Sequence, residues 1–439
     1  MPSEDKHGSR ESSIRASVTT TGPWYRRPPA ICSALMMRSL ATPATIAVLL
    51  GGLTGLAPFA LDTYLPAFPE MAASLGASRA TVQQSLTSYL APYAAMMLVH
   101  GPMSDRYGRR TWIMVGLLLF CAGSLGCAFA QSIEALLGWR MVQGLSVGAT
   151  TVVARALVRD LYEGAAAQRV FAQVNLVFIL APAAAPILGG YLLTSLGWRS
   201  IFWFLLFYPV VLLAVCWRWL PETLPREKRV SLRFTRLAGN LLTLGERPAF
   251  GGLVLMTAAA FCGFFGYVLA APAFVRDLLG LKPTEFGWLF LATACGTLVG
   301  SFWATRRADT KHPVATVGTG LGLAAAAAIA NLAYHAVLPA AVPWSVLPLA
   351  LYCCGYALML PSATLLILDT SPLPRGATSS LQSFLQIACA TLTSAVVVPY
   401  VTRSAFWLAA AMFAWWFLSA ICWIASCRGS KSSVPPATH

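Results

Sequence analysis

Charged residues are scarce in this chain of 439 residues, because Asp, Glu, Lys and Arg make up 11% of it and apolar residues make up 57%. A soluble globular protein is about 25% charged and about 45–50% apolar. An excess of apolar residues on this scale needs a solvent other than water, and each membrane span takes about 20 of them. The composition therefore excludes soluble enzymes, secreted domains and disordered proteins, and it predicts a protein that crosses a membrane many times.

Acidic residues are the scarcer of the two signs, with 16 Asp and Glu against 31 Lys and Arg, for a formal net charge of +15. A basic surplus can indicate nucleic-acid binding. Here, however, the basic residues lie in short clusters between apolar runs, which is typical of the cytoplasmic loops of membrane proteins. We therefore expect a lipid bilayer as the surrounding medium and no nucleic-acid partner.

The chain also lacks the short patterns of many enzymes and metal sites. It contains no H-E-x-x-H motif, no G-x-S-x-G motif and no nucleotide-binding P-loop, and none of its 11 cysteines forms a C-x-x-C pair. We therefore expect no enzyme activity, no metal and no other cofactor, and we interpret the cysteines as inert packing. A channel is disfavoured as well, because ion-selective filters need repeated charges or filter loops.

Apolar segments recur along the chain and predict an all-α integral membrane fold with twelve spans in two pseudo-symmetric six-helix bundles. The expected spans are 43–66, 80–102, 111–131, 133–157, 168–194, 198–220, 249–275, 284–304, 313–335, 343–368, 376–401 and 404–427. The expected domains are a disordered basic tail (1–41), an N-terminal bundle (42–220), a linker (221–248), a C-terminal bundle (249–427) and a second tail (428–439). The tail has no apolar region of a signal peptide, and Met36 and Met37 offer alternative start sites.

The distribution of Lys and Arg predicts how the chain is oriented. When basic residues near a span end are counted with the adjoining loop, 25 of the 31 lie on the side of the two termini, and Arg140 lies deeper inside a span. Basic residues concentrate in cytoplasmic loops, so we expect both termini in the cytoplasm and the protein in the inner membrane. The five basic residues expected on the outer side are Arg79, Arg199, Arg276, Lys282 and Arg403.

Two ionisable residues inside predicted spans are candidates for function, because a charged group at mid-membrane costs about 2.5–3.5 kcal/mol or more. Asp62 lies in the outer part of the first span, where a carboxyl group can bind a proton reversibly because desolvation disfavours its charged form. An interfacial Asp at a helix end before Pro66 is the alternative. Arg140 lies in the fourth span and needs a partner or a water-filled cavity, or else it bonds to backbone carbonyls as a structural residue.

A basic segment between the second and third spans is predicted to form a tight cytoplasmic turn. Asp105 is expected to cap a helix there or to pair with a neighbouring arginine such as Arg155 or Arg159. The residues of the segment that we single out are Gly101, Asp105, Arg106, Gly108, Arg109 and Arg110.

Two further sets of residues lie inside predicted spans. Prolines in the fifth span predict a bend at the interface between moving halves, with a simple packing kink as the alternative. Gly144 and Gly148 in the fourth span form a G-x-x-x-G face that lets another helix approach closely. The fifth-span set is Pro182, Pro186, Gly189 and Gly190, and candidate cavity residues are Tyr64, Tyr89, Tyr93, Asn175 and Phe178.

The segment from Gly101 to Arg110 resembles the G-x-L-A-D-R-x-G-R-K signature of the major facilitator superfamily, with Met103 in place of Leu and Arg110 in place of Lys. The residues around Arg140 look like the fourth-span motif of that family. Ala181–Gly190 is similar to the fifth-span motif of its proton-coupled antiporter branch, with Ala in place of Gly at two positions.

The string Asp62-Thr63-Tyr64-Leu65-Pro66-Ala67-Phe68-Pro69 resembles the D-M-Y-L-P-A-x-P string of the Bcr/CflA drug-resistance subfamily. The resemblance, which covers about 42–427, implies a monomeric proton-driven exporter of amphipathic drugs such as bicyclomycin or chloramphenicol. Protons and small molecules would be its partners and the proton gradient its energy source, with Asp62 and Arg140 coupling the two. Some relatives carry a second acid where this chain has Thr54, which places more of the coupling on Asp62. An exporter of a metabolite or sugar-type solute on the same scaffold is the alternative.

Overall fold

The computed structural model describes residues 43–225, 227, 229, 234–308 and 311–431. In this part of the chain every regular element is a helix and no strand occurs, which confirms the predicted all-α fold. The predicted basic tail (1–41) and the last eight residues of the second tail lie outside the described residues.

Each half of the chain contains a series of long helices joined by short turns. The first half comprises α2 (Pro43–Asp62), η1 (Leu65–Ala67), α3 (Phe68–Ser74), α4 (Arg79–Met97), α5 (His100–Tyr107), α6 (Arg109–Ala128), α7 (Ile133–Leu161), α8 (Gly164–Leu196) and α9 (Arg199–Trp219). The second half comprises α11 (Pro248–Leu269), η3 (Pro272–Leu278), η4 (Pro283–Glu285), α12 (Gly287–Ala308), α13 (Pro313–Val337), α14 (Leu347–Thr370), α15 (Arg375–Leu392), η5 (Thr393–Val397), α16 (Val398–Val401) and α17 (Ala405–Lys431).

Eleven helices among the described residues are long and apolar enough to cross a membrane. The remaining predicted span, 80–102, corresponds to α4, which is less apolar than the others because it carries Gln83 and Gln84. This span is also two helices rather than one, since α4 ends at Met97 and α5 begins at His100. The twelve predicted segments are therefore all helical, with a break near the end of the second.

The same pairs of helices pack together in both halves. In the first half, α4 and α6 pack against α7, and α9 packs against α6. In the second half, α12 and α13 pack against α14, and α17 packs against α13. A duplicated six-helix unit requires this recurrence of partners in chain order, so the packing supports a pseudo-symmetric fold. The predicted domain boundaries stay a prediction.

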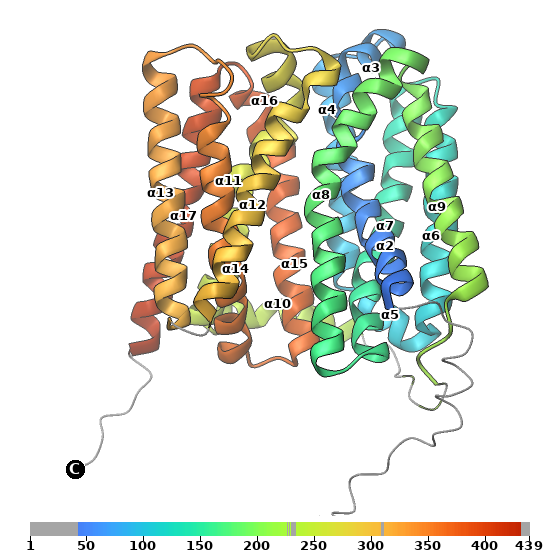
Figure 1. The fold of residues 1–439 in the computed structure, drawn as a ribbon, viewed down its shortest axis with the longest axis vertical. Coiled ribbons are helices and arrows are strands. Elements are labelled where there is room, and N and C mark those ends of the chain that lie inside the picture. Colours follow the sequence, from blue (N-terminus) through green and yellow to red (C-terminus); the bar gives the residue numbers. More distant parts are fainter. Residues whose placement is uncertain (1–42, 226, 228, 230–233, 309–310, 432–439) are drawn as a thin grey trace, which may run out of the picture. The chain divides into compact units, whose positions relative to one another are not determined.

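The two halves meet along two helix pairs, α4 with α15 and α8 with α12. We call the end of the bundle where α4 begins and α8 ends the Arg79 face, and the opposite end, where α5 meets α6, the Arg109 face. In Figure 1, α3 lies at the Arg79 face, and α5 and α10 lie at the Arg109 face.

The polar linker between the halves contains a helix that the sequence did not predict. This helix, α10 (Phe234–Glu246), carries Leu241 and Leu244, which pack against the hydrophobic core of the second half. The carbonyl of Leu244 contacts the position where a Cβ on Gly251 would lie, so α11 can start close to α10 only with glycine there. The linker is therefore attached to the second half rather than being a free connection.

Candidate functional site

Arg140 lies in the middle of the first half with a fully buried side chain. Its Nη1 donates a hydrogen bond to the carbonyl of Ala60 at 3.0 Å and another to the side-chain oxygen of Gln143 at 2.7 Å. Gln143 is itself held from the neighbouring helix, because its Nε2 donates to the hydroxyl of Ser124 at 2.8 Å. Three helices, α2, α6 and α7, thus fix the position of the guanidinium.

Two tyrosine rings enclose the Arg140 guanidinium. Its central carbon lies 4.3 Å from the ring centroid of Tyr64 and 4.4 Å from that of Tyr89. Each ring is anchored by its hydroxyl: Tyr64 is hydrogen-bonded to Ser85 at 3.0 Å, and Tyr89 donates to the carbonyl of Ala57 at 3.2 Å. Cation–π contacts of this kind are worth about 2 kcal/mol or more when the groups are desolvated, which helps to offset the burial of the charge.

Asp62 lies at the end of α2 and is also buried, 2% exposed. Asp62 and Arg140 both lie within electrostatic range of Tyr89, yet the ion pairs found among the described residues do not include the two together. Within the described part of the chain, Oδ1 of Asp62 and the Nε and Nη2 atoms of Arg140 have no hydrogen-bond partner. The first half therefore contains a buried carboxyl group and a buried guanidinium that form no ion pair with each other among the described residues, and each keeps unused hydrogen-bonding capacity.

The predicted G-x-x-x-G face of the fourth span lets α4 approach α7, as expected. A Cβ on Gly144 would collide with the carbonyl of Tyr89, and a Cβ on Gly148 would meet the ring of His100. The close approach of α4 is what brings the Tyr89 ring over Arg140.

The five predicted cavity residues separate into two groups. Tyr64 and Tyr89 belong to the buried enclosure of Arg140. Tyr93 and Phe178 instead lie near Arg155, on α7: the guanidinium carbon of Arg155 is 6.0 Å from the Phe178 ring centroid, and Tyr93 lies beside Thr151 and Arg155. Asn175, one turn before Phe178 on α8, is exposed. The sequence analysis did not assign Arg155 to this group.

The predicted turn between the second and third spans is mostly helical, so the prediction of a ten-residue turn was wrong. Residues Gly101–Tyr107 belong to α5, and the chain reverses at Gly108, whose φ of +98° favours glycine. A Cβ on Gly108 would also collide with the carboxylate of Glu222. Gly101 has open space around it, so no neighbouring atom requires a glycine at this position.

Arg109 is the centre of a polar network on the Arg109 face. Its Nη1 lies 2.7 Å from Asp105, and its Nε lies 3.2 Å from Asp160, at the end of α7. Asp105 was expected to cap a helix or to pair with a neighbouring arginine such as Arg155 or Arg159. It does pair with an arginine, but this arginine is Arg109 rather than either of the two examples. The turn at Gly108 brings Arg109 back under α5 and next to Asp105, whereas Arg155 lies among aromatic rings.

The segment that follows α9 joins this network, which the sequence analysis missed. Glu222 accepts a hydrogen bond from the backbone N–H of Arg109 at 2.9 Å and lies 3.9 Å from Arg229. Thr223 donates to Asp160 at 3.0 Å, and Arg110 donates to the carbonyl of Trp217. The sequence signal that could have indicated this contact was a Glu directly after the end of a predicted span. Arg106, by contrast, is exposed and lies over the ring of its neighbour Tyr107.

The proline- and glycine-containing segment of the fifth span lies where the two halves meet. α8 continues without interruption through Pro182 and Pro186. A Cβ on Gly189 would collide with the carbonyl of Thr63, and a Cβ on Gly190 with the carbonyl of Pro283 in the second half. The two glycines therefore allow α8 to contact both the residue after Asp62 and the other half.

Ion pairs between the halves lie on the Arg79 face. Arg79 pairs with Asp277 at 2.7 Å, and Glu70 pairs with Arg276 at 3.4 Å, so two adjacent residues of η3 hold two first-half residues of opposite sign. Deeper along the same interface, the hydroxyl of Thr87 donates to that of Ser394 at 3.0 Å. These contacts close the Arg79 face between the halves.

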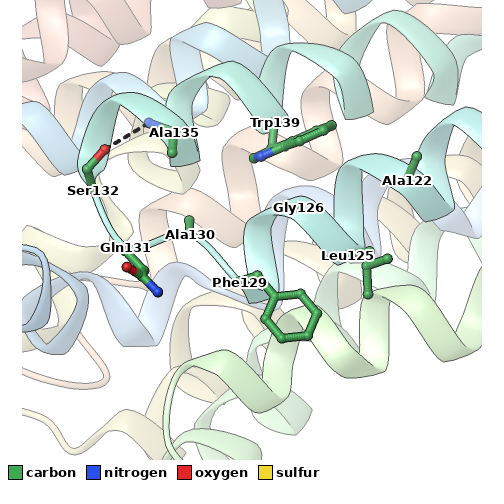
Figure 2. Close-up of a pocket in the computed structure, with 9 residues that line it drawn as sticks. All are labelled: Ala122, Leu125, Gly126, Phe129, Ala130, Gln131, Ser132, Ala135 and Trp139. Carbon is green, nitrogen blue, oxygen red and sulfur yellow. Dashed lines mark hydrogen bonds between the residues drawn. The ribbon is translucent and has the colours of Figure 1, made fainter.

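A shallow hollow lies between the end of α6 and the start of α7 (Figure 2). The Ser132 hydroxyl there accepts a hydrogen bond from the backbone N–H of Ala135 at 3.3 Å, which caps α7. No titratable side chain lines this hollow, so it offers no site for proton or metal chemistry. The lining residues are Ala122, Leu125, Gly126, Phe129, Ala130, Gln131, Ser132, Ala135 and Trp139.

Within the ranges that the structure describes, no three His, Cys, Asp or Glu side chains are grouped to hold a metal ion. Apart from Cys427, the cysteines of those ranges are free thiols, and most of them are buried.

Comparisons with known proteins agree with this architecture. The model of the Major Facilitator Superfamily matches residues 50–393. An uncharacterized MFS-type transporter, YdgK of Bacillus subtilis, is 30% identical over 354 residues, which is 80% of this chain and 88% of that protein. The crystal structure of a bacterial homologue of the human lysosomal transporter Spinster covers 90% of this chain and 99% of its own, with a TM-score of 0.65 and 17% identity.

Two relatives have names that refer to drug resistance. A bicyclomycin resistance protein homologue of Haemophilus influenzae is 32% identical over 58% of this chain and 65% of its own length. A chloramphenicol resistance protein of Pseudomonas aeruginosa is 35% identical over 57% of this chain and 59% of its own length. This chain therefore matches less than two thirds of each of these two proteins. The family model spans most of the chain, and with the transporter-like helix packing it leads to one conclusion: the chain is a multi-pass membrane protein that belongs to the major facilitator superfamily of transporters.

Proposed function

We propose that this transporter exports amphipathic small molecules, including drugs of the bicyclomycin or chloramphenicol type, in exchange for protons. The observation that carries the proposal is that Asp62 and Arg140 are both buried in the first half and form no ion pair with each other among the described residues. Ionisable residues inside a membrane bundle generally belong to ion or substrate pathways. The names of the drug-resistance relatives support the substrate class.

Asp62 is the proton carrier in this proposal. An ionised carboxylate that is buried without a partner is costly, so the arrangement in this structure suits the protonated, neutral form of Asp62. Loss of the proton creates a negative charge at the end of α2, the helix whose Ala60 carbonyl already accepts a hydrogen bond from Arg140, and the Nε and Nη2 atoms of Arg140 are unused. Those two atoms form the edge of the guanidinium that can hold a carboxylate in a bidentate manner. Deprotonation thus favours a rearrangement of the end of α2 toward Arg140.

This rearrangement is positioned to affect the contact between the halves. Thr63 follows Asp62 directly, and its carbonyl lies against Gly189 of α8. The next residue of α8, Gly190, lies against Pro283 of the second half. Movement at Asp62 therefore reaches the interface through one pair of adjacent glycines.

The structure is consistent with the state that opens toward the cytoplasm. In this proposal the protein lies in the inner membrane with its termini in the cytoplasm and the Arg79 face on the periplasmic side, and the distribution of Lys and Arg supports this orientation. The ion pairs Arg79–Asp277 and Glu70–Arg276 close that face. Export by alternating access requires these contacts to break and the halves to close at the Arg109 face instead.

The experiment is transport by the full chain in proteoliposomes with an imposed pH gradient and radiolabelled chloramphenicol. We expect uphill accumulation by the unmodified protein, and loss of that accumulation with Asp62→Asn while exchange of labelled for unlabelled drug continues. Asp369→Asn is the matched control, because Asp369 is an exposed residue near the end of α14, and we expect it to leave transport unchanged. Uphill transport that persists in Asp62→Asn would show that Asp62 is not the coupling group. Accumulation of a sugar-type solute but of no drug would favour the alternative substrate class.

A further inference from the structure

Arg155 is a cation within the membrane-spanning helix α7 that has no acidic partner among the described residues. None of the ion pairs found among the described residues includes it, although its side chain is exposed rather than withdrawn into the protein. Arg159, one turn further along the helix, carries the same sign and adds repulsion. Arg155 therefore remains a positive charge that no acidic side chain of the described residues neutralises. A charge inside a membrane-spanning helix is costly and generally marks a functional site.

The neighbours of Arg155 show on which side of the first half it lies. Its guanidinium extends toward Phe178 on α8, with Tyr93 on α4 beside it. α4 and α8 are the two long helices of the first half that pack against the second half, through α15 and α12. A side chain that lies between residues of α4 and α8 is therefore on the side of the first half that faces the second, where a transported molecule passes.

Arg155 differs from Arg140 in what it can bind. Arg140 is fully buried, is covered by two tyrosine rings and already donates to Ala60 and Gln143. Arg155 is exposed, and no hydrogen bond to a described residue uses its guanidinium. The Phe178 ring centroid is 6.0 Å from its guanidinium carbon, which leaves room on the cation for another group. The Arg155 guanidinium is thus open to a solute and lies beside aromatic rings.

We propose that Arg155, together with Tyr93 and Phe178, forms a subsite that binds the carboxylate of an amphipathic aromatic anion. This inference rests on the proposed export function and specifies one class of its substrates. The guanidinium holds the carboxylate through paired N–H donors, and the Phe178 ring packs against the apolar part of the molecule. The subsite lies on α7 about four turns from Arg140, so binding of the anion and protonation of Asp62 involve different residues of the same half.

The test is equilibrium binding of two fluorescent probes, naphthoate and naphthamide, to the full-length protein in detergent. The probes have nearly the same shape, but naphthoate is an anion and naphthamide is neutral. We expect the unmodified protein to bind naphthoate about tenfold more tightly than naphthamide, which corresponds to one charge-assisted contact. We expect Arg155→Gln to abolish this preference while it leaves naphthamide affinity unchanged, and Arg155→Lys to keep part of it.

Arg159→Gln is the matched control, because it removes the same charge one turn away on the same helix. The preference for naphthoate should survive in that variant. The proposal is overturned if the unmodified protein binds both probes equally or binds neither, if Arg155→Gln keeps the preference, or if Arg159→Gln removes it to the same extent. Binding in detergent does not need a proton gradient, so a failure of coupling at Asp62 appears in the proteoliposome experiment and not in this one.

Discussion

Glu222 accepts a hydrogen bond from the backbone N–H of Arg109 at 2.9 Å, so a residue that follows α9 caps the first turn of α6. The same carboxylate accepts from the backbone N–H of Leu224 at 3.1 Å and lies near Arg229. The connection between the two halves is thereby attached to the α5–α6 junction. A rearrangement of Asp105, Arg109 or Asp160 during transport would therefore also act on the linker.

Glu222→Gln should weaken this cap, because a neutral amide is a poorer acceptor for the N–H groups at a helix N-terminus. We expect a loss of stability of about 1 kcal/mol, together with slower export. Thermal unfolding in detergent and initial transport rates measure the two effects. Glu227→Gln is the control, because Glu227 is exposed in the same linker. Equal effects of the two substitutions would contradict a specific role for Glu222.

The pair of Arg79 and Asp277 allows a charge exchange across the closed face. Arg79→Asp should place two like charges together and disfavour closure of the Arg79 face, and addition of Asp277→Arg should restore it. Both side chains are largely exposed, at 64% and 41%, so we expect a coupling of about 0.5 kcal/mol in a double-mutant cycle of thermal unfolding. Transport rates should follow the same order. Independent, additive effects of the two substitutions would argue against a functional contact.

Gly144 is predicted to tolerate no side chain. Gly144→Val would collide with the carbonyl of Tyr89 and push α4 away from α7, and overpacking of this kind costs about 1–3 kcal/mol. Gly138→Ala on the same helix is the control, because a Cβ there meets open space. We expect a lower unfolding temperature and loss of proton-coupled transport for Gly144→Val alone. If both variants behave like the unmodified protein, the close approach of the helices is not required.

The enclosure of Arg140 by aromatic rings can be tested at Tyr89. Tyr89→Phe keeps the ring but removes the hydroxyl that donates to Ala57, whereas Tyr89→Leu removes the cation–π contact as well. We expect Tyr89→Leu to be less stable than Tyr89→Phe by about 1–2 kcal/mol. Chemical denaturation of the two variants measures the difference. Equal stability would show that the ring face contributes nothing to holding the guanidinium.

The sequence alone was sufficient to identify the family and the two charged residues of the candidate site. Twelve apolar segments and the scarcity of charge are properties of composition and spacing, and they do not depend on how helices pack. For the same reason Asp62 and Arg140 could be singled out, because any ionisable residue inside a span is unusual wherever its helix faces. The G-x-x-x-G face at Gly144 was predicted too, since small residues at this spacing permit close approach in many helix pairs.

What the tertiary structure decided is which side chains meet. The rotation of each helix and the partner it packs against arise from contacts between distant segments, so no local pattern shows that Arg140 lies between Tyr64 and Tyr89. The turn at Gly108 brought Arg109 to Asp105, so the arginine that pairs with Asp105 is Arg109 and not Arg155 or Arg159. Charged residues are scarce in this sequence, and the packing of the helices determines what each of them can contact. Of the arginines in α7, packing encloses Arg140 and leaves Arg155 open to a solute.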